Sequence, residues 1–136
     1  MNWLQKTSQV LNIDKWESRY PRAGGVVSGL TVDQGLVPNT ESISAGMNDW
    51  YELPGLREVP MSDFGSAKPN DNFYAKNDIE HSRSLAEQIH NSGHITPLIV
   101  GIDAEGPYIL EGGHRFVALG ELGVLSFPAL VVVDLI

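Results

Sequence analysis

The sequence contains no cysteine among its 136 residues. Disulfide bonds, thiolate nucleophiles and sulfur-ligated zinc sites are therefore excluded. Long apolar segments are also missing, because no run approaches the roughly 20 residues that a membrane-spanning helix requires. The first residues show no basic stretch followed by an apolar one, so no signal peptide is evident and a cytoplasmic location is expected.

Positive charge is scarce as well. Nine lysine and arginine residues stand against 17 aspartate and glutamate residues, which gives a net charge of −8. The imbalance is steepest over residues 77–136, where two arginines accompany eight acidic residues. A surface that grips duplex DNA through its phosphates needs clustered lysine and arginine. The charge pattern therefore disfavours duplex DNA as a partner and favours a small anionic ligand in a local site.

Length and composition indicate one modest domain, residues 51–136, preceded by an extension over residues 1–50. The extension begins with an amphipathic helix that Tyr20-Pro21 ends, and residues 22–48 read as loops with one short strand near Leu30–Val32. Ordering such a polar, glycine-rich stretch is costly without a partner. We expect the extension to wrap the domain, to mediate self-association or to dock onto a protein partner.

Hydrophobic periodicity over residues 51–136 predicts alternating strands and helices. The pattern favours a small α+β fold in which a mixed sheet carries packed helices. The expected elements are a short edge strand near 56–61, a helix capped by Asn77 or Asp78 and running to about Asn91, a hairpin of strands 96–102 and 107–110, a helix over about 114–122 and a final strand over 128–136.

The most informative motif is Glu111-Gly112-Gly113-His114-Arg115, which joins the hairpin to the second helix. The glycines permit positive φ and close approach of a ligand, and the first amides of the helix favour an anion. Cations at a helix N-terminus cost about 0.3–1 kcal/mol each unless an anion lies there. The acidic side chain before the glycines suits a divalent metal or proton transfer. The alternative is a tight turn whose arginine pairs with Glu111 or Glu121.

The same residues carry a resemblance to a known family. The run Ile109–Leu119, followed by Leu122-Gly123 and Phe127-Pro128-Ala129, resembles the ParB/sulfiredoxin-like superfamily, as do Leu85–Ile89, Gly93 and Pro97–Val100. The resemblance covers about residues 57–136. It implies a small α+β domain that binds ATP or another nucleotide.

Activities within the superfamily differ, and the motif separates them. Sulfiredoxins use a cysteine inside Gly-Gly-Cys-His-Arg, and because Gly113 runs directly into His114, sulfinic-acid repair is excluded. Free-serine kinases carry an acidic residue before Gly-His-His-Arg, a position that Glu111 fits. Partition proteins hydrolyse CTP and bind DNA through a separate helix-turn-helix domain.

Carried over to this chain, the resemblance implies a phosphate site at Gly112, Gly113, His114 and Arg115. Glu111 would hold Mg²⁺ or act as a base, and Glu111 and His114 are the catalytic candidates. The expected reaction is Mg²⁺-dependent phosphoryl transfer or nucleotide hydrolysis. Two alternatives remain: a nuclease of the same fold, which needs a basic track that the acidic domain lacks, and a non-catalytic interaction or regulatory module of a phage or mobile element.

Other polar residues are weaker candidates. Thr96, before the central strand, can donate a hydroxyl to a phosphate. His94 enters the same strand and either faces the ligand or is an ordinary loop histidine. Arg57 and Glu58 lie where superfamily members begin their first strand, near the nucleotide, although a solvated edge pair is the simpler interpretation. We expect His81 to be exposed on the first helix of the domain.

Overall fold

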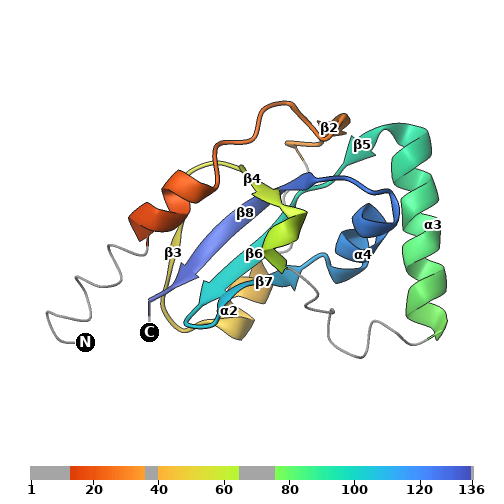
Figure 1. Ribbon diagram of the computed structural model, residues 1–136. Helices are drawn as coiled ribbons and strands as arrows, with labels where there is room; N and C mark the ends of the chain where they lie inside the picture. Colours follow the sequence, from red (N-terminus) through yellow and green to blue (C-terminus); the bar gives the residue numbers. More distant parts are fainter. Residues whose placement is uncertain (1–12, 36–39, 65–75, 136) are drawn as a thin grey trace, which may run out of the picture.

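The computed structural model describes residues 13–35, 40–64 and 76–135. Residues 13–19 are helical, and the remaining elements follow them in chain order (Figure 1). They are β1 (Val26–Val27), β2 (Leu30–Val32), α2 (Glu41–Gly46), β3 (Trp50–Glu52), β4 (Arg57–Pro60), the 3-10 turn η1 (Met61–Phe64), α3 (Lys76–Ser92), β5 (His94–Ile95), β6 (Leu98–Asp103), β7 (Gly106–Glu111), α4 (Gly113–Glu121) and β8 (Ser126–Asp134).

Strand β8 is the centre of the larger sheet. It pairs in parallel with β6 and antiparallel with β3 and β4, while β7 pairs antiparallel with β6. Parallel neighbours require a crossover connection, and here β7 and α4 supply it. Because Glu111 at the end of β7 pairs with Ile99, the start of α4 lies beside the start of β6.

Side chains of the central strands alternate between two clusters, as the pleat requires. Leu98, Val100 and Ile102 of β6 belong to the main core, together with alternate residues of β8. Ile99 and Val132 face the other side, where they pack with Ile43 and Met47. The sheet is therefore buried on both faces, with α4 over one and α2 over the other (Figure 1).

The helices and the small sheet complete the fold. Helix α3 packs on α4 at one end of the larger sheet, and Ala86 and Ile89 of α3 join Ala118 and Leu119 of α4 in the main core (Figure 1). Strands β1, β2 and β5 form a three-stranded sheet in which β2 and β5 run in parallel. Within residues 13–35, 40–64 and 76–135, no helix is long and apolar enough to cross a membrane.

The α+β class expected from the sequence is confirmed, and so are the long helix, the hairpin, the second helix and the final strand. The loop interpretation of residues 22–48 is wrong in part. Besides the expected strand near residue 30, this stretch contains β1 and α2. Between β1 and β2 lies a hairpin turn in which Ser28 and Gly29 both adopt positive φ, of 50° and 78°. The residues that favour such a turn also favour loops, so composition did not separate the two. Residues 1–12 of the expected N-terminal helix lie outside the described residues.

Arg57 corrects the expectation of a solvated edge pair. Arg57 is only 5% exposed. Its guanidinium donates from Nη1 to the Tyr20 carbonyl and from Nε to the Pro54 carbonyl, both at 3.1 Å. A third donor, Nη2, lies 3.4 Å from the Glu17 carboxylate. The strand is not a free edge at this point, because an isolated bridge joins Arg57 to Arg22. Arg57 therefore anchors the N-terminal segment on the sheet.

We expect Arg57→Met to lower the free energy of unfolding by about 1–3 kcal/mol, because two carbonyl groups lose their donor in a buried setting. Urea denaturation monitored by circular dichroism measures the change. The exposed Arg83 on α3 provides a matched control, and Arg83→Met should leave the midpoint nearly unchanged. Equal stability of the Arg57 variant and wild type would contradict the anchoring role.

A second anchor joins helix 13–19 to η1. Asp63 accepts hydrogen bonds from Arg19 Nε at 2.8 Å and from the Tyr20 hydroxyl at 2.7 Å, and its side chain is 5% exposed. The hydrogen bonds from Arg19 lower the pKa of the Asp63 carboxyl, with burial acting in the opposite direction. Burial and the bond to Asp63 raise the pKa of Tyr20, so its hydroxyl remains a donor at neutral pH. We call this arrangement the Asp63 clasp.

The clasp makes stability depend on pH. A carboxyl whose pKa is depressed in the folded state stabilises the fold above its unfolded pKa of about 4, and this contribution is lost as the pH falls through the folded pKa. We therefore expect wild type to melt above Asp63→Asn at pH 7 and the difference to shrink below pH 4. Thermal melts of both proteins from pH 7 to pH 2 test this, and a difference that stays constant with pH would contradict it.

Candidate functional site

A cavity of about 430 Å³ lies where β7 ends and α4 begins. Two elements distant in sequence form it, since α3 contributes one wall and the β7–α4 junction the other. Its described lining residues are His81, Leu85, Leu110, Glu111, Gly112, Gly113, His114 and Arg115. The whole sequence motif singled out above therefore opens onto one cavity.

Gly112 shapes the turn at the base of this cavity. It precedes the first residue of α4 with a φ of 97°, in the left-handed region that glycine tolerates and other residues avoid. A Cβ atom at this position would lie 2.8 Å from Arg115 Nη2 and 2.8 Å from Leu98 Cγ. Only glycine therefore leaves room for the guanidinium to lie against the turn.

Arg115 is half-buried, and its guanidinium has few hydrogen-bond partners. Its Nη2 donates a long hydrogen bond of 3.4 Å to the Pro97 carbonyl, and its Nε is buried without a hydrogen-bond partner within the described part of the chain. Burial lowers the pKa of Arg115, while the charge of Glu111 raises it. A buried donor without an acceptor is costly. The Arg115 guanidinium therefore has an unfilled donor beside the cavity.

The backbone at the start of α4 adds further donors. The first bond of the helical ladder runs from the Phe116 amide to the Gly112 carbonyl, at 2.8 Å. Amides earlier in a helix have no acceptor within it, and Gly112 has no side chain that could cap them. Residues 113–115, whose amides precede the first bond of the ladder, line the same cavity as the guanidinium, and the positive end of the helix dipole lies there.

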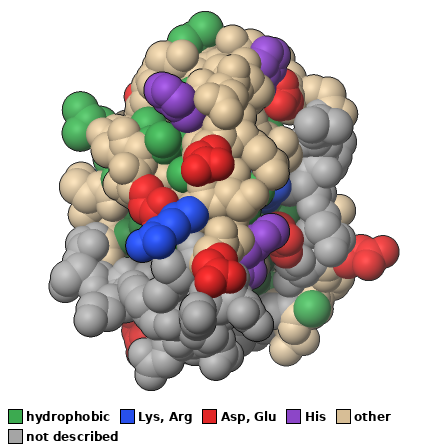
Figure 2. All heavy atoms as spheres, turned by 90° about the vertical axis from the view of Figure 1, so that its right-hand side faces the viewer, with side chains coloured by type: hydrophobic (Ala, Val, Ile, Leu, Met, Phe, Trp, Pro, Cys, Tyr) green, Lys and Arg blue, Asp and Glu red, His purple; other side chains and the backbone are tan. Residues whose placement is uncertain are grey.

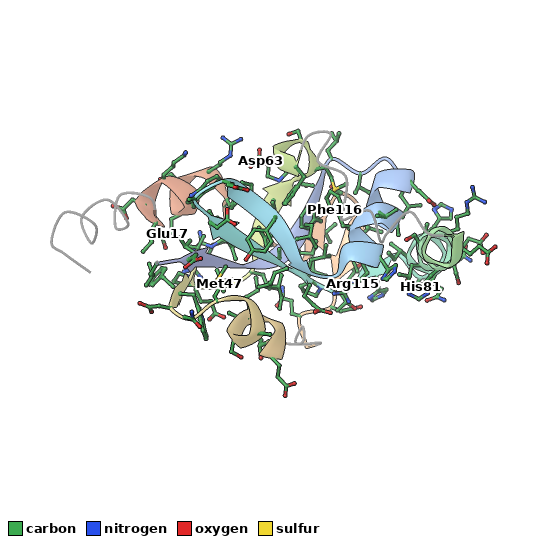
Figure 3. All side chains as sticks on the ribbon, turned by 90° about the horizontal axis from the view of Figure 1, so that it is seen from below. Glu17, Met47, Asp63, His81, Arg115 and Phe116 are labelled. Carbon is green, nitrogen blue, oxygen red and sulfur yellow. The ribbon has the colours of Figure 1, made fainter. Side chains whose placement is uncertain are left out.

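Histidine side chains from two helices meet at the cavity. The rings of His81 on α3 and His114 on α4 lie edge to face, with centroids 4.7 Å apart and an interplanar angle of 85°. Figure 3 shows His81 and Arg115 on facing helices on the same side of the molecule. His81 is exposed, as expected. It also lines the cavity, one helical turn before Leu85, which the sequence pattern placed inward. That spacing is the signal that could have found it.

Glu111 is the carboxylate of the cavity. Across the described residues, no group of three or more histidine, aspartate or glutamate side chains is placed to hold a metal ion. Mg²⁺ seldom needs such a cage, since it is commonly held by one or two carboxylates together with water and substrate phosphates. A single carboxylate at this cavity is compatible with Mg²⁺ held together with water and a bound phosphate, and Glu111 is the residue that would hold it.

Comparison with known proteins finds a similar curated sequence and a similar solved structure. No family model matches it. It is 27% identical over 96 residues to the chromosome-partitioning protein ParB of Myxococcus xanthus, a match that covers 71% of this chain and 32% of that protein. The resemblance to the ParB/sulfiredoxin-like superfamily is confirmed. The chain spans about a third of the length of the curated relative. Among solved structures, sulfiredoxin from Arabidopsis thaliana is similar with a TM-score of 0.41 and 21% identity, over 57% of this chain and 84% of that one.

The weaker candidate residues lie around the cavity or away from it. Thr96 is half-buried next to Pro97, whose carbonyl accepts from Arg115. His94 Nδ1 lies 2.7 Å from Asp33 Oδ1, in the small sheet. Glu58 accepts a hydrogen bond from Ser126 Oγ at 2.8 Å. Arg57, as described above, anchors the N-terminal segment. Among the described residues, none of these side chains lines the cavity.

The outer face of the helical layer is acidic. Figure 2 shows acidic side chains and histidines distributed over it, with little surface from lysine or arginine. Exposed residues of α3 and α4 include Glu80, Glu87 and Glu121. The arginine of the motif, Arg115, lines the cavity, and the exposed Arg83 of α3 stands among these acidic residues.

Proposed function

We propose that this domain binds a nucleoside di- or triphosphate, with the phosphates over Gly112, Gly113, His114 and Arg115. The observation that carries the proposal is the buried Arg115 Nε, which has no hydrogen-bond partner among the described residues and lies against a side-chain-free turn of a 430 Å³ cavity. An Arg guanidinium binds phosphate oxygens through paired donors. A phosphate in the cavity would supply the acceptor that the protein does not, once the guanidinium turns toward it.

In the reaction we propose, the bond between the terminal phosphorus and its bridging oxygen breaks, and a new bond forms to the oxygen of an acceptor hydroxyl or of water. The amides of Gly113 and His114 and the Arg115 guanidinium stabilise the charge on the phosphoryl oxygens. Glu111 accepts the proton that the acceptor oxygen loses, or holds Mg²⁺. When bound, Mg²⁺ neutralises phosphate charge. The resemblance of the acidic residue before the turn to that of free-serine kinases supports phosphoryl transfer to a small hydroxyl compound.

A thermal-shift panel tests the binding. ATP, ADP, CTP and GTP are each added with Mg²⁺, and adenosine serves as a control that lacks phosphate. At least one nucleotide should raise the melting temperature, because a ligand that binds only the folded state stabilises it in proportion to RT ln(1 + [L]/Kd). Adenosine should have no comparable effect. Identical melting temperatures across the panel at millimolar ligand would reject the proposal.

We expect Arg115→Ala to weaken nucleotide binding by about 1–3 kcal/mol, the range for the loss of a charge-assisted hydrogen bond. Isothermal titration calorimetry on wild type and the variant measures the difference directly. Arg83→Ala, which removes an exposed arginine from α3, is the matched control and should bind as wild type does. Unchanged affinity in Arg115→Ala would remove this residue from the site.

A further inference from the structure

The N-terminal segment does not line the proposed phosphate site in the described structure, but contacts lead from it to α4. Helix 13–19 is fixed at two points, by Arg57 at the Tyr20 carbonyl and by the clasp at Asp63. Separation from its donors would leave the Asp63 carboxylate without the hydrogen bonds that offset its partial burial. The position of η1 is therefore set by the segment that precedes the sheet.

Aromatic packing continues from the clasp to the start of α4. Phe64 follows Asp63 directly and is buried. Its ring centroid lies 5.2 Å from that of Phe116 and 5.8 Å from that of Phe127, and Phe116 and Phe127 are 5.9 Å apart. Figure 3 shows Asp63 and Phe116 on adjoining elements in the body of the molecule.

Phe116 is the residue that closes the first turn of α4. Its amide donates to the Gly112 carbonyl at 2.8 Å, and it directly follows Arg115. A shift of η1 would therefore move the ring whose backbone fixes the turn on which the guanidinium and the first amides lie. Charged recognition tolerates little displacement, since positioning errors of about 1 Å can cost a site much of its function.

We propose that Asp63 is a positioning residue for the phosphate site: held by Arg19 and Tyr20, it keeps Phe64 against Phe116 and so fixes the first turn of α4. The inference rests on the proposed nucleotide binding. It gives the segment before the sheet a role in ligand affinity without any contact to the ligand. The residue acts through Phe64 and Phe116, not through its own charge at the cavity.

The experiment compares Asp63→Asn with Asp14→Asn, which neutralises an exposed acid on helix 13–19 itself. Hydrogen exchange followed by mass spectrometry is measured on peptides covering residues 113–119 and 98–103, and calorimetry measures affinity for ATP and for CTP, each with Mg²⁺. In Asp63→Asn we expect exchange over 113–119 to rise and affinity to fall, each roughly three- to tenfold. Exchange over 98–103 and the properties of Asp14→Asn should match wild type.

Two further variants separate positioning from a general loss of structure. Tyr20→Phe removes a single donor from the clasp and should change exchange over 113–119 in the same direction by less. In an Arg115→Ala background, Asp63→Asn should cause a smaller further loss of affinity, because placing that guanidinium is part of its effect. Unchanged exchange over 113–119, an equal rise over 98–103, or an undiminished loss of affinity in the Arg115→Ala background would overturn the inference.

Wild-type protein that binds neither nucleotide would overturn the proposed function as well, whereas normal binding with no response to Asp63→Asn would overturn the positioning role alone.

Discussion

Gly112→Ala should all but remove nucleotide binding. The added Cβ would lie 2.8 Å from Arg115 Nη2 and from Leu98 Cγ, and the backbone would have to hold a φ of 97° that alanine adopts only with strain. We expect the free energy of unfolding to fall by about 1–3 kcal/mol, the usual cost of a residue held in such a conformation. Affinity should fall at least as far as in Arg115→Ala, because the guanidinium and the first-turn amides are displaced together.

Gly120→Ala is the matched control for this variant. Gly120 lies within the same helix, and a Cβ there would meet only Met61 Cε at 3.7 Å, an ordinary contact. Alanine in a helix interior is more favourable than glycine by about 0.5–1 kcal/mol, so this variant should be at least as stable as wild type and should bind nucleotide normally. Chemical denaturation and calorimetry on the pair provide both measurements. If Gly112→Ala retained wild-type affinity, the turn would not be the phosphate cradle.

Glu111→Gln should spare nucleotide binding and abolish turnover. Glutamine keeps the shape of the side chain but can neither accept a proton at neutral pH nor offer a charged ligand to Mg²⁺. Loss of a general base costs about 10²- to 10⁴-fold in rate, so release of ADP or phosphate should fall by about that factor. Calorimetry with the same nucleotide should show affinity close to that of wild type.

Glu105→Gln provides the comparison, because Glu105 is an exposed acid in the turn between β6 and β7 of the same hairpin. Its turnover should equal that of wild type. The two variants differ only in whether the lost carboxylate lies at the cavity. A Glu111→Gln protein with full turnover would assign the chemistry elsewhere and leave Glu111 as a neighbour of the site.

The elements around the site were predictable because each leaves a strong local pattern. The apolar run of β6, the turn that follows it and the β-branched β8 follow directly from hydrophobicity and turn residues. The glycine pair at residues 112 and 113 marks the strand-to-helix junction, and the helix dipole makes that junction favourable for an anion. Such signals are local, so no tertiary information was needed to read them.

What the sequence did not reveal depends on contacts between distant segments. His81 reaches the cavity because α3 packs on α4. Its spacing from Leu85 places it on the inward side of α3 but does not say which element it meets. Arg57 is buried because residues 13–22 fold over the strand that carries it, so a residue typical of an exposed edge became an anchor. Helix α2 has only six residues and is stabilised by packing of Ile43 and Met47 on the sheet rather than by propensity.

The central claim, that phosphates bind at the start of α4, is tested most directly by a ¹H–¹⁵N nuclear magnetic resonance titration of the whole chain with ATP and with CTP, each with Mg²⁺. The account predicts that the backbone amides of Gly113, His114 and Arg115 and the Arg115 Nε–H shift most and saturate together. Saturating shifts confined to other elements, or a spectrum that either nucleotide leaves unchanged at millimolar concentration, would contradict it.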